Sequence, residues 1–269
     1  MTAKSILNVT SRKKQDNMLS FSNATSAGNN QAVAAGGLFV NGLTTYGMCV
    51  FSPTARALIT GGNTNLGVDP CDRTSSTCFI RGFKENLRIQ TSTPLPWIWR
   101  RLVFTSKSNV FNTQVAADTA TPKFSPYSDT SVGMGRLWLN LQATGATATI
   151  ATMNAVIFRG TLNQDWNDVI TAKVDTSRIT VMSDVTRTIR TGNSNGHFSE
   201  RKLWYPMNKN IVYDDDESGA AVTTSYYSTT SKAGMGDVYI VDYLVPGVGG
   251  AAGDLINLNS TATLYWHEK

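Results

Sequence analysis

The chain has 269 residues, of which 41% are hydrophobic and 16% are charged, and its formal net charge is +5. The length suits one large all-β domain or two ordinary ones, and the low charged fraction disfavours surface helices laced with salt bridges. No window is apolar enough to cross a bilayer, so we expect no membrane partner. The net positive charge permits an anionic partner without requiring one.

The N-terminal segment is polar and basic, and we expect residues 1–30 to form a short flexible arm ahead of one domain over residues 31–269. Arg12, Lys13 and Lys14 cluster within this segment. Because a flexible basic arm has little structural use, these three residues are the first candidates for binding the phosphates of DNA. The segment has no apolar stretch of the kind found in signal peptides, so we expect a reducing compartment.

The three cysteines, Cys49, Cys71 and Cys78, are predicted to be small buried hydrophobic side chains. The spacing between Cys71 and Cys78 matches zinc ligands poorly. His197 and His267, the two histidines that might complete such a site, lie far along the chain. We therefore expect no metal and no cofactor.

Alternation of apolar and polar residues predicts strands along most of the chain. The segment Thr77–Thr91 alternates as a half-buried strand does, and Trp97–Thr105 is apolar on both sides except at Arg100 and Arg101. Further strands are expected over Tyr46–Phe51, Arg136–Leu141, Ala155–Arg159, Thr186–Arg190, Lys202–Tyr205, Asp237–Val245 and Thr261–Trp266.

Helical periodicity is scarce. One short helix is predicted over Asn163–Lys173, where Trp166, Val169 and Ile170 are spaced by three and four residues. Many short strands, little helix and no repeats indicate an all-β fold made of a single sandwich or barrel. We expect a jelly-roll β-sandwich, which accommodates long inter-strand loops such as residues 106–135.

Basic residues alternate with aromatic residues on two of the predicted strands. This pattern can follow a phosphate backbone while ring faces stack on bases. In the alternative interpretation the tryptophans are core residues and the arginines pair with acids such as Glu85; the sequence does not separate the two. The candidates for DNA contact in these strands are Arg81, Lys84, Arg88, Arg100 and Arg101.

Two motifs near the C-terminus have competing interpretations. The glycine-rich segment 247–253 lacks the long following helix that a dinucleotide site needs, so we interpret it as a loop. The acidic run Asp214, Asp215 and Asp216, continued by Glu217, is most simply a solvated turn. It is also a candidate cation site or a contact between subunits.

The chain ends in a strand-like aromatic segment. Tyr265 and Trp266 lie where most proteins place a frayed polar tail. A terminus held in this way belongs to a sheet or to an interface with another copy, so both residues are candidates for a subunit interface.

Catalytic motifs are weak in this sequence. His197 follows a turn-like segment and His267 lies close to the C-terminus, and neither has a recognisable nucleophile context. We therefore expect no enzymatic activity and no catalytic residues. A jelly-roll module that binds carbohydrate, lectin-like or for viral attachment, is the alternative function, and a β-sandwich hydrolase ranks third.

Four segments resemble the capsid proteins of genomoviruses, the gemycircularvirus-like viruses with small circular single-stranded DNA genomes. The segments are TSRKKQDNM near the start, residues 77–107, residues 164–179 and the whole of 203–269. The resemblance implies a single jelly roll that assembles, in about sixty copies, into a small icosahedral shell around single-stranded DNA. It also implies a protein of the virion that assembles in the host nucleus.

Proteins of that family carry a longer arginine-rich arm ahead of the segment that matches Thr10–Lys14, used for packaging and nuclear entry. About sixty copies at a net charge of +5 supply roughly +300. That is far below the phosphate charge of a complete small genome, so small cations or such an arm would have to supply the difference.

Overall fold

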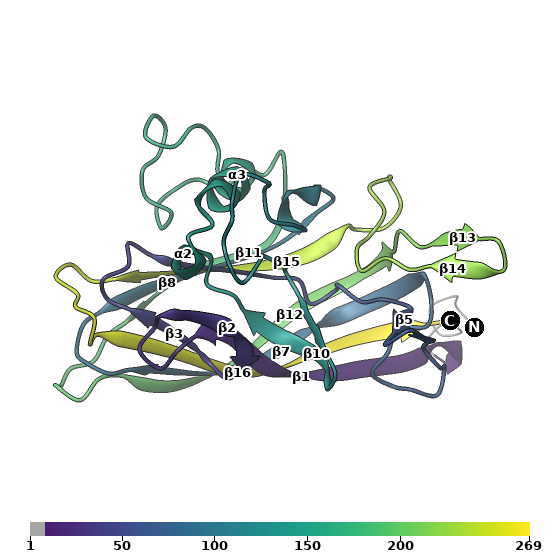
Figure 1. The fold of residues 1–269 in the computed structure, drawn as a ribbon, viewed down its shortest axis with the longest axis horizontal. Helices are drawn as coiled ribbons and strands as arrows, with labels where there is room; N and C mark the ends of the chain where they lie inside the picture. Colours follow the sequence, from purple (N-terminus) through teal and green to yellow (C-terminus); the bar gives the residue numbers. More distant parts are fainter. Residues whose placement is uncertain (1–8) are drawn as a thin grey trace.

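This computed structural model describes residues 9–269. Two β-sheets, mostly antiparallel, pack face to face and form the lower and upper halves of Figure 1. The larger sheet has eight strands, in the order β12 (Phe198–Val212), β7 (Thr77–Thr91), β16 (Leu255–Glu268), β1 (Arg12–Ala24), β10 (Gly133–Trp138) and β9 (Ser128–Thr130), with β2 (Asn30–Ala35) paired to β1 and β3 (Leu38–Asn41) to β16. The smaller sheet has four, in the order β11 (Thr180–Ile189), β8 (Trp97–Ser106), β15 (Asp237–Pro246) and β4 (Gly47–Phe51).

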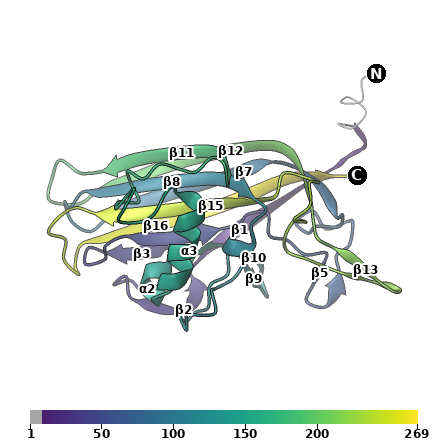
Figure 2. The same ribbon diagram turned by 90° about the horizontal axis from the view of Figure 1, so that it is seen from above.

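Short elements decorate this sandwich. Two small hairpins are β5 (Ile59–Thr60) with β6 (Asn63–Thr64), and β13 (Asp216–Ser218) with β14 (Ala221–Thr223). The helices that lie wholly within residues 9–269 are the 3₁₀ turn η1 (Asn109–Phe111), α2 (Leu141–Thr144) and α3 (Thr147–Ile157). Figure 2 shows α2 and α3 in front of the sheets when the molecule is seen from above.

Eight of the strands are nested pairwise along the chain. β1 pairs with β16, β4 with β15, β7 with β12 and β8 with β11, always antiparallel. This is one long hairpin wound into two sheets, which is the topology of a jelly roll. The predicted all-β jelly-roll sandwich with little helix is therefore confirmed.

Side-chain alternation explains the central strands. In the second half of β7, Phe83, Leu87 and Ile89 point into the core while Lys84 and Arg88 stay exposed. The first eight residues of β15 are buried. One face of β15 lies on the core, and aromatic residues from the connecting segments, including Phe111 and Phe158, pack on Tyr239 and Tyr243 of this strand.

The outer faces of the two sheets are therefore unequal. The outer face of the smaller sheet is covered by η1, α3 and the segment that follows α3. On the larger sheet, the outward residues of β12, β7, β16 and β1 are mostly exposed or half-buried. Among residues 9–269, the sandwich thus leaves one broad sheet face uncovered.

Four ionised side chains meet between the two sheets, and each is at most 3% exposed. The members of this buried quartet are Glu85 of β7, Arg101 of β8, Arg136 of β10 and Asp242 of β15. Arg101 Nε lies 2.6 Å from Asp242 Oδ1, and Arg136 Nε lies 2.8 Å from Glu85 Oε1. Arg101 also pairs with Glu85, and Arg136 with Asp242, so each carboxylate contacts both guanidinium groups.

Tryptophan rings enclose this quartet. The Arg136 guanidinium lies 3.7 Å from the centroid of the Trp138 ring, and Trp99 Nε1 donates a hydrogen bond to Asp242 Oδ1 at 2.8 Å. With two positive and two negative charges, the cluster is neutral, which offsets the cost of burying ions. The quartet links both sheets at their centre.

The flexible arm expected over residues 1–30 is wrong for the part that the structure describes. Residues 12–24 form β1, which pairs with β16 over Arg12–Leu19, with β10 over Ser20–Ser22 and with β2 over Phe21–Ala24. Met18 is buried in the core, and the polar Ser20 donates to the Ser260 carbonyl at 2.6 Å. Residues 1–8 of the expected arm lie outside the described residues.

Two secondary-structure predictions in the middle of the chain are also wrong. The segment 163–173 forms turns instead of a helix, and the helix α3 lies earlier, over Thr147–Ile157, where a strand was expected at 155–159. Arg100 explains the first difference. Its Nη1 donates to the carbonyls of Val169, Ile170 and Ala172, at 2.7, 3.1 and 2.9 Å, so these groups need no helical partner.

We expect Asp242→Asn to lower the free energy of unfolding by about 3–5 kcal/mol, because it leaves buried guanidinium charge uncompensated. Denaturant titration of the purified protein measures this change. Glu200→Gln is the control, because Glu200 lies in an exposed pair with Lys202 at 3.9 Å and its loss should cost at most about 1 kcal/mol. Equal, small losses in both variants would contradict the role of the quartet.

The quartet also predicts sensitivity to acid. Burial acts to raise the pKa of Glu85, but the charges of Arg101 and Arg136 outweigh it and lower the pKa from 4.5 to about 2. A carboxyl whose pKa is lower in the folded state stabilises the fold above its unfolded pKa, and this stability is lost as the pH falls from about 4.5 towards 2. Urea titrations across this range should show a steep loss in the wild type and a shallower one in Glu85→Gln; parallel curves would contradict the assignment.

Candidate nucleic-acid interface

Basic side chains gather on the open face of the larger sheet. The exposed basic residues there come from β1, β7 and β12 and include Lys13, Arg81, Lys84, Arg88 and Lys202. Side chains that point the same way on paired strands are neighbours across a sheet. Alternation along these strands therefore concentrates positive charge on one surface.

A groove of about 580 Å³ lies at one end of this face. We call it the basic groove; Lys13, Gln15, Arg81, Lys84, Trp204, Tyr265 and His267 are among the residues that line it. β16 runs between β1 and β7, so Lys13 of β1 lies on one side of Tyr265 and His267, and Arg81 and Lys84 of β7 lie on the other.

Three carboxylates of β1, β7 and β16 are engaged in salt bridges instead of facing this groove. Asp16, Glu85 and Glu268 are in salt bridges to Arg56, to the quartet arginines and to Lys14, respectively. Glu200, which is exposed, lies opposite Arg88 on the neighbouring strand, towards the far end of β7 from the basic groove. An anion in the groove therefore meets cations without a competing carboxylate from these three residues.

An aromatic pair forms part of the groove wall. Trp204 lies opposite Lys84 in the β12–β7 pairing and is 48% exposed. Its ring packs edge-to-face on Tyr265, with 5.9 Å between centroids at 66°. Gly82 makes this arrangement possible, because a Cβ atom at that position would lie 2.6 Å from the end of the Trp204 ring.

His267 is the titratable residue of the groove nearest pH 7. It lies beside the Phe79 ring, with 6.0 Å between centroids, and is paired in register with Lys13. Burial, and then the positive charges of Lys13 and Arg81, lower the pKa of His267. The ring is therefore neutral at pH 7, and a phosphate nearby would favour its protonated form.

The structure separates the eight predicted DNA contacts into two groups. Arg12, Lys13, Arg81, Lys84 and Arg88 are exposed. Of these, Lys13, Arg81 and Lys84 meet in the basic groove, whereas Arg88 lies further along β7. Arg12 begins β1, and its guanidinium lies against Gly67.

Three of the predicted contacts are wrong, because their side chains are buried in ion pairs. Lys14 bonds Glu268 at 3.3 Å and Arg100 bonds Asp184 at 2.7 Å, while Arg101 belongs to the quartet. For Arg100 and Arg101 the core interpretation, with Glu85 as a partner of Arg101, is the one that the structure supports.

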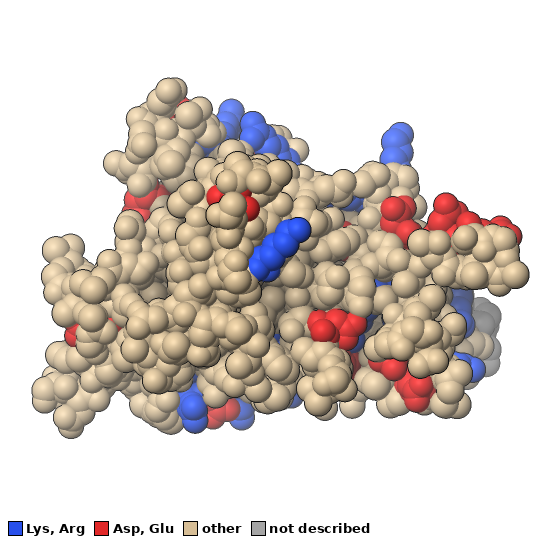
Figure 3. Space-filling view, viewed as in Figure 1, with Lys and Arg blue, Asp and Glu red and all other residues tan. Residues whose placement is uncertain are grey.

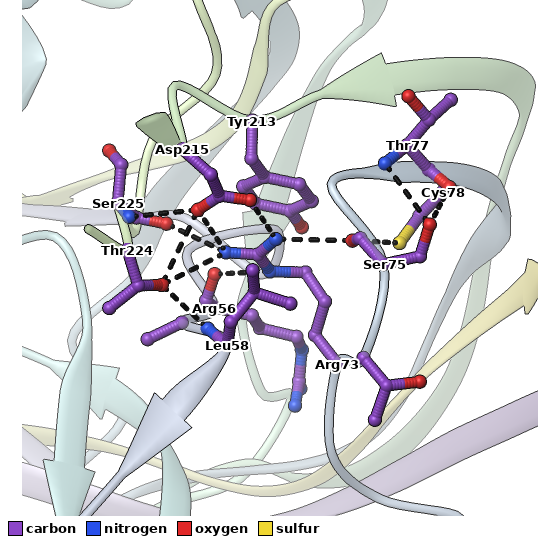
Figure 4. Close-up of polar contacts among 12 residues, drawn as sticks. Arg56, Leu58, Arg73, Ser75, Thr77, Cys78, Tyr213, Asp215, Thr224 and Ser225 are labelled. Atoms are coloured by element: carbon purple, nitrogen blue, oxygen red, sulfur yellow. Dashed lines mark hydrogen bonds and ion pairs between the residues drawn. The ribbon is translucent and has the colours of Figure 1, made fainter. Parts of the chain in front are cut away.

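The acidic run divides in a similar way (Figure 4). The Arg73 guanidinium forms two bonds to Asp215, of 2.6 and 2.9 Å, and lies 3.7 Å from the centroid of the Tyr213 ring. Burial acts to raise the pKa of Asp215, but the bonds from Arg73 and from the Ser225 N–H outweigh it and lower the pKa. The Asp215 side chain is therefore buried in an ion pair with Arg73 and is not available for a contact between subunits.

Asp214 and Asp216 are exposed, and Asp216 starts the β13–β14 hairpin that projects from one end of the sandwich. Acidic atoms gather over this hairpin in Figure 3.

Of the two aromatic residues predicted to lie at a subunit interface, Trp266 is 1% exposed and belongs to the core, so the prediction for Trp266 is wrong. Tyr265 is half-buried and faces the basic groove.

Cys49 and Cys78 are buried, as expected, and burial raises the pKa of both thiols. Cys71 is exposed, contrary to the expectation.

Within residues 9–269, no group of three or more His, Cys, Asp or Glu side chains is arranged to hold a metal ion. The glycine-rich segment 247–253 is the loop between β15 and β16, as predicted.

Three groove residues were not recognised in the sequence: Gly82, Trp204 and His267. Gly82 interrupts an otherwise regular strand, which is a signal of close approach by another group. Trp204 and His267 join the groove through strand pairing with Lys84 and Phe79, which lie more than one hundred residues earlier in the chain.

Within residues 9–269, no helix combines the length and the apolar character needed to cross a membrane. A comparison of the chain with models of known protein families and with curated protein sequences gave no match.

We expect Gly82→Ala to lower the free energy of unfolding by about 1–3 kcal/mol, because the new methyl group overlaps the Trp204 ring and the Tyr205 carbonyl oxygen. Denaturant titration measures the loss. Gly192→Ala is the control, since its Cβ would meet no atom within 4 Å, and its change should stay within about 0.5 kcal/mol. If the two variants were equally stable, the close packing of Trp204 on β7 would be contradicted.

Proposed function

We propose that this chain is a capsid protein, of the genomovirus type, that assembles into a small icosahedral shell enclosing circular single-stranded DNA. The observation that carries the proposal is the combination of a jelly roll with one open, basic sheet face. A shell subunit needs one surface for its cargo and other surfaces for its neighbours, and the open basic face and the loops and edges of the sandwich are our candidates for these two roles.

The proposed cargo surface is the open face of the larger sheet, turned towards the shell interior. Its exposed cations neutralise phosphates without reading sequence, since phosphate contacts carry no base information. Lys13, Arg81 and Lys84 supply this charge in the basic groove.

The proposed neighbour surfaces are the loops and edges of the sandwich. Charged atoms are sparse on the face shown in Figure 3, and the cores of protein interfaces are depleted of charge. Exposed Asp214 and Asp216, on the projecting side of the sandwich, are candidates for contact with a basic surface of an adjacent copy. Closed symmetry of about sixty copies would complete the shell, in the host nucleus.

The resemblance to genomovirus capsid proteins supports the same function from independent observations, namely the segments 10–18, 77–107, 164–179 and 203–269. The net charge of +5 remains small for a full genome, so the proposal includes small cations or a further basic arm as additional counter-charge.

Negative-stain microscopy and light scattering of the expressed protein test assembly. We expect closed particles of uniform size that carry nuclease-protected nucleic acid. A species that stays monomeric under every salt and pH condition would contradict the capsid proposal. A monomer whose melting temperature rises with a saccharide would favour a carbohydrate-binding module instead.

Matched charge variants test the cargo surface in the same preparations. Arg81→Gln with Lys84→Gln should lower the amount of protected nucleic acid per particle. Lys173→Gln, exposed in the segment that covers the smaller sheet, should not. Equal packaging by both variants would argue against the larger sheet as the cargo surface.

A further inference from the structure

We infer that the basic groove is a nucleotide-binding site, in which an unpaired base stacks on Trp204 while Lys13, Arg81 and Lys84 bind the flanking phosphates. The groove therefore selects single strands over duplexes. The choice of DNA as the natural ligand rests on the proposed function; the stacking site itself rests on the geometry of the groove.

The exposed indole is the first argument. A tryptophan usually buries most of its ring, because burial of its apolar surface stabilises the fold. Trp204 keeps 48% of its surface exposed although it lies on a long strand of the larger sheet. Gly82 and Tyr265 fix one side of the ring, so its remaining surface is held in place for a planar partner.

The arrangement of charge around the rings is the second argument. Lys84 lies beside Trp204 across the β7–β12 pairing, and Lys13 lies on the opposite side of β16. Arg81 is fixed by its bond to the Asn208 side chain. In the strand order β1–β16–β7–β12, a nucleic-acid chain that crosses the sheet meets Lys13, Tyr265, Lys84 and Trp204, so that cations and aromatic rings alternate along its path.

The size of the groove is the third argument. A space of about 580 Å³ accommodates a nucleotide but not a double helix. In a duplex both faces of each base are already stacked, so only its phosphates can reach the groove cations. Stacking on Trp204 is therefore available to an unpaired base alone.

Fluorescence anisotropy with short labelled oligonucleotides tests the inference. Trp204→Ala should weaken binding of oligo-dT about 5- to 140-fold, as the loss of one base stack predicts, and should leave duplex binding unchanged. The control is Phe198→Ala, an equally accessible aromatic on the same strand that is 68% exposed and lies outside the groove; it should leave both affinities unchanged.

Salt dependence separates stacking from charge. Arg81→Gln should flatten the slope of log affinity against log salt by about 0.7, which is one phosphate contact to a single strand. Trp204→Ala should leave that slope unchanged. Parallel titrations with oligo-rU show whether RNA is taken by the same stacking chemistry, and an equal effect of Trp204→Ala on RNA and DNA is expected.

The two histidines report where the ligand binds. The NMR signals of His267, in the groove, should shift when thymidine monophosphate or oligo-dT is added. Those of His197, which lies by the far end of β7 and bonds Ser199, should not.

The inference is overturned if Trp204→Ala binds oligo-dT as the wild type does, if duplex and single strand bind equally tightly, or if His267 does not respond. Particle formation separates these outcomes from the capsid proposal. Particles whose subunits fail these tests overturn the nucleotide site alone, whereas single-strand binding by a protein that never assembles overturns the capsid proposal alone.

Discussion

The neutral quartet of Glu85, Arg101, Arg136 and Asp242 is the interaction on which the sandwich depends. It joins β7 and β10 of the larger sheet to β8 and β15 of the smaller one. Each ion needs both of its partners, because an unpaired charge at this depth costs several kcal/mol. The register of four strands is therefore tied to one geometry. The quartet also keeps Arg101 and Arg136 buried, so neither is available to a ligand at the surface.

The sequence was sufficient where alternation or a continuous apolar run decides the structure. Thr77–Thr91 and Asp237–Val245 were recognised as strands because their apolar side chains fill the core directly. β1 was missed because polar residues occupy its inward positions: Ser20 bonds Ser260, and Lys14 bonds Glu268. Nothing near β1 in the chain reveals these partners. The turns at 163–173 were missed for the same reason, since Arg100 supplies the donors from a distant strand.

In the candidate site too, local alternation predicted some residues correctly, whereas others depend on partners far away in the chain. Strand alternation placed Lys84 and Arg88 on the polar side of a half-buried strand, and both are exposed in the structure. Alternation could not exclude Arg101, because its burial depends on Asp242, 141 residues away. The aromatic pair of Trp204 and Tyr265 also depends on the strand order β12–β7–β16. Composition thus permitted an anionic partner, and only the topology shows which of the candidate basic residues lie together.

The nested strand pairs have a consequence for how the protein is made. Ser20 and Ser260 are joined across 240 residues, so β1 has no partner on its β16 side until β16 has been synthesised. Contacts of such long range fold slowly, because the chain must close large loops before it gains their energy. Until then β1 and β7 present unpaired edges that invite association with other chains. The chain is therefore most exposed to association with other chains during its synthesis, and pairing of β16 with β1 and β7 ends this period.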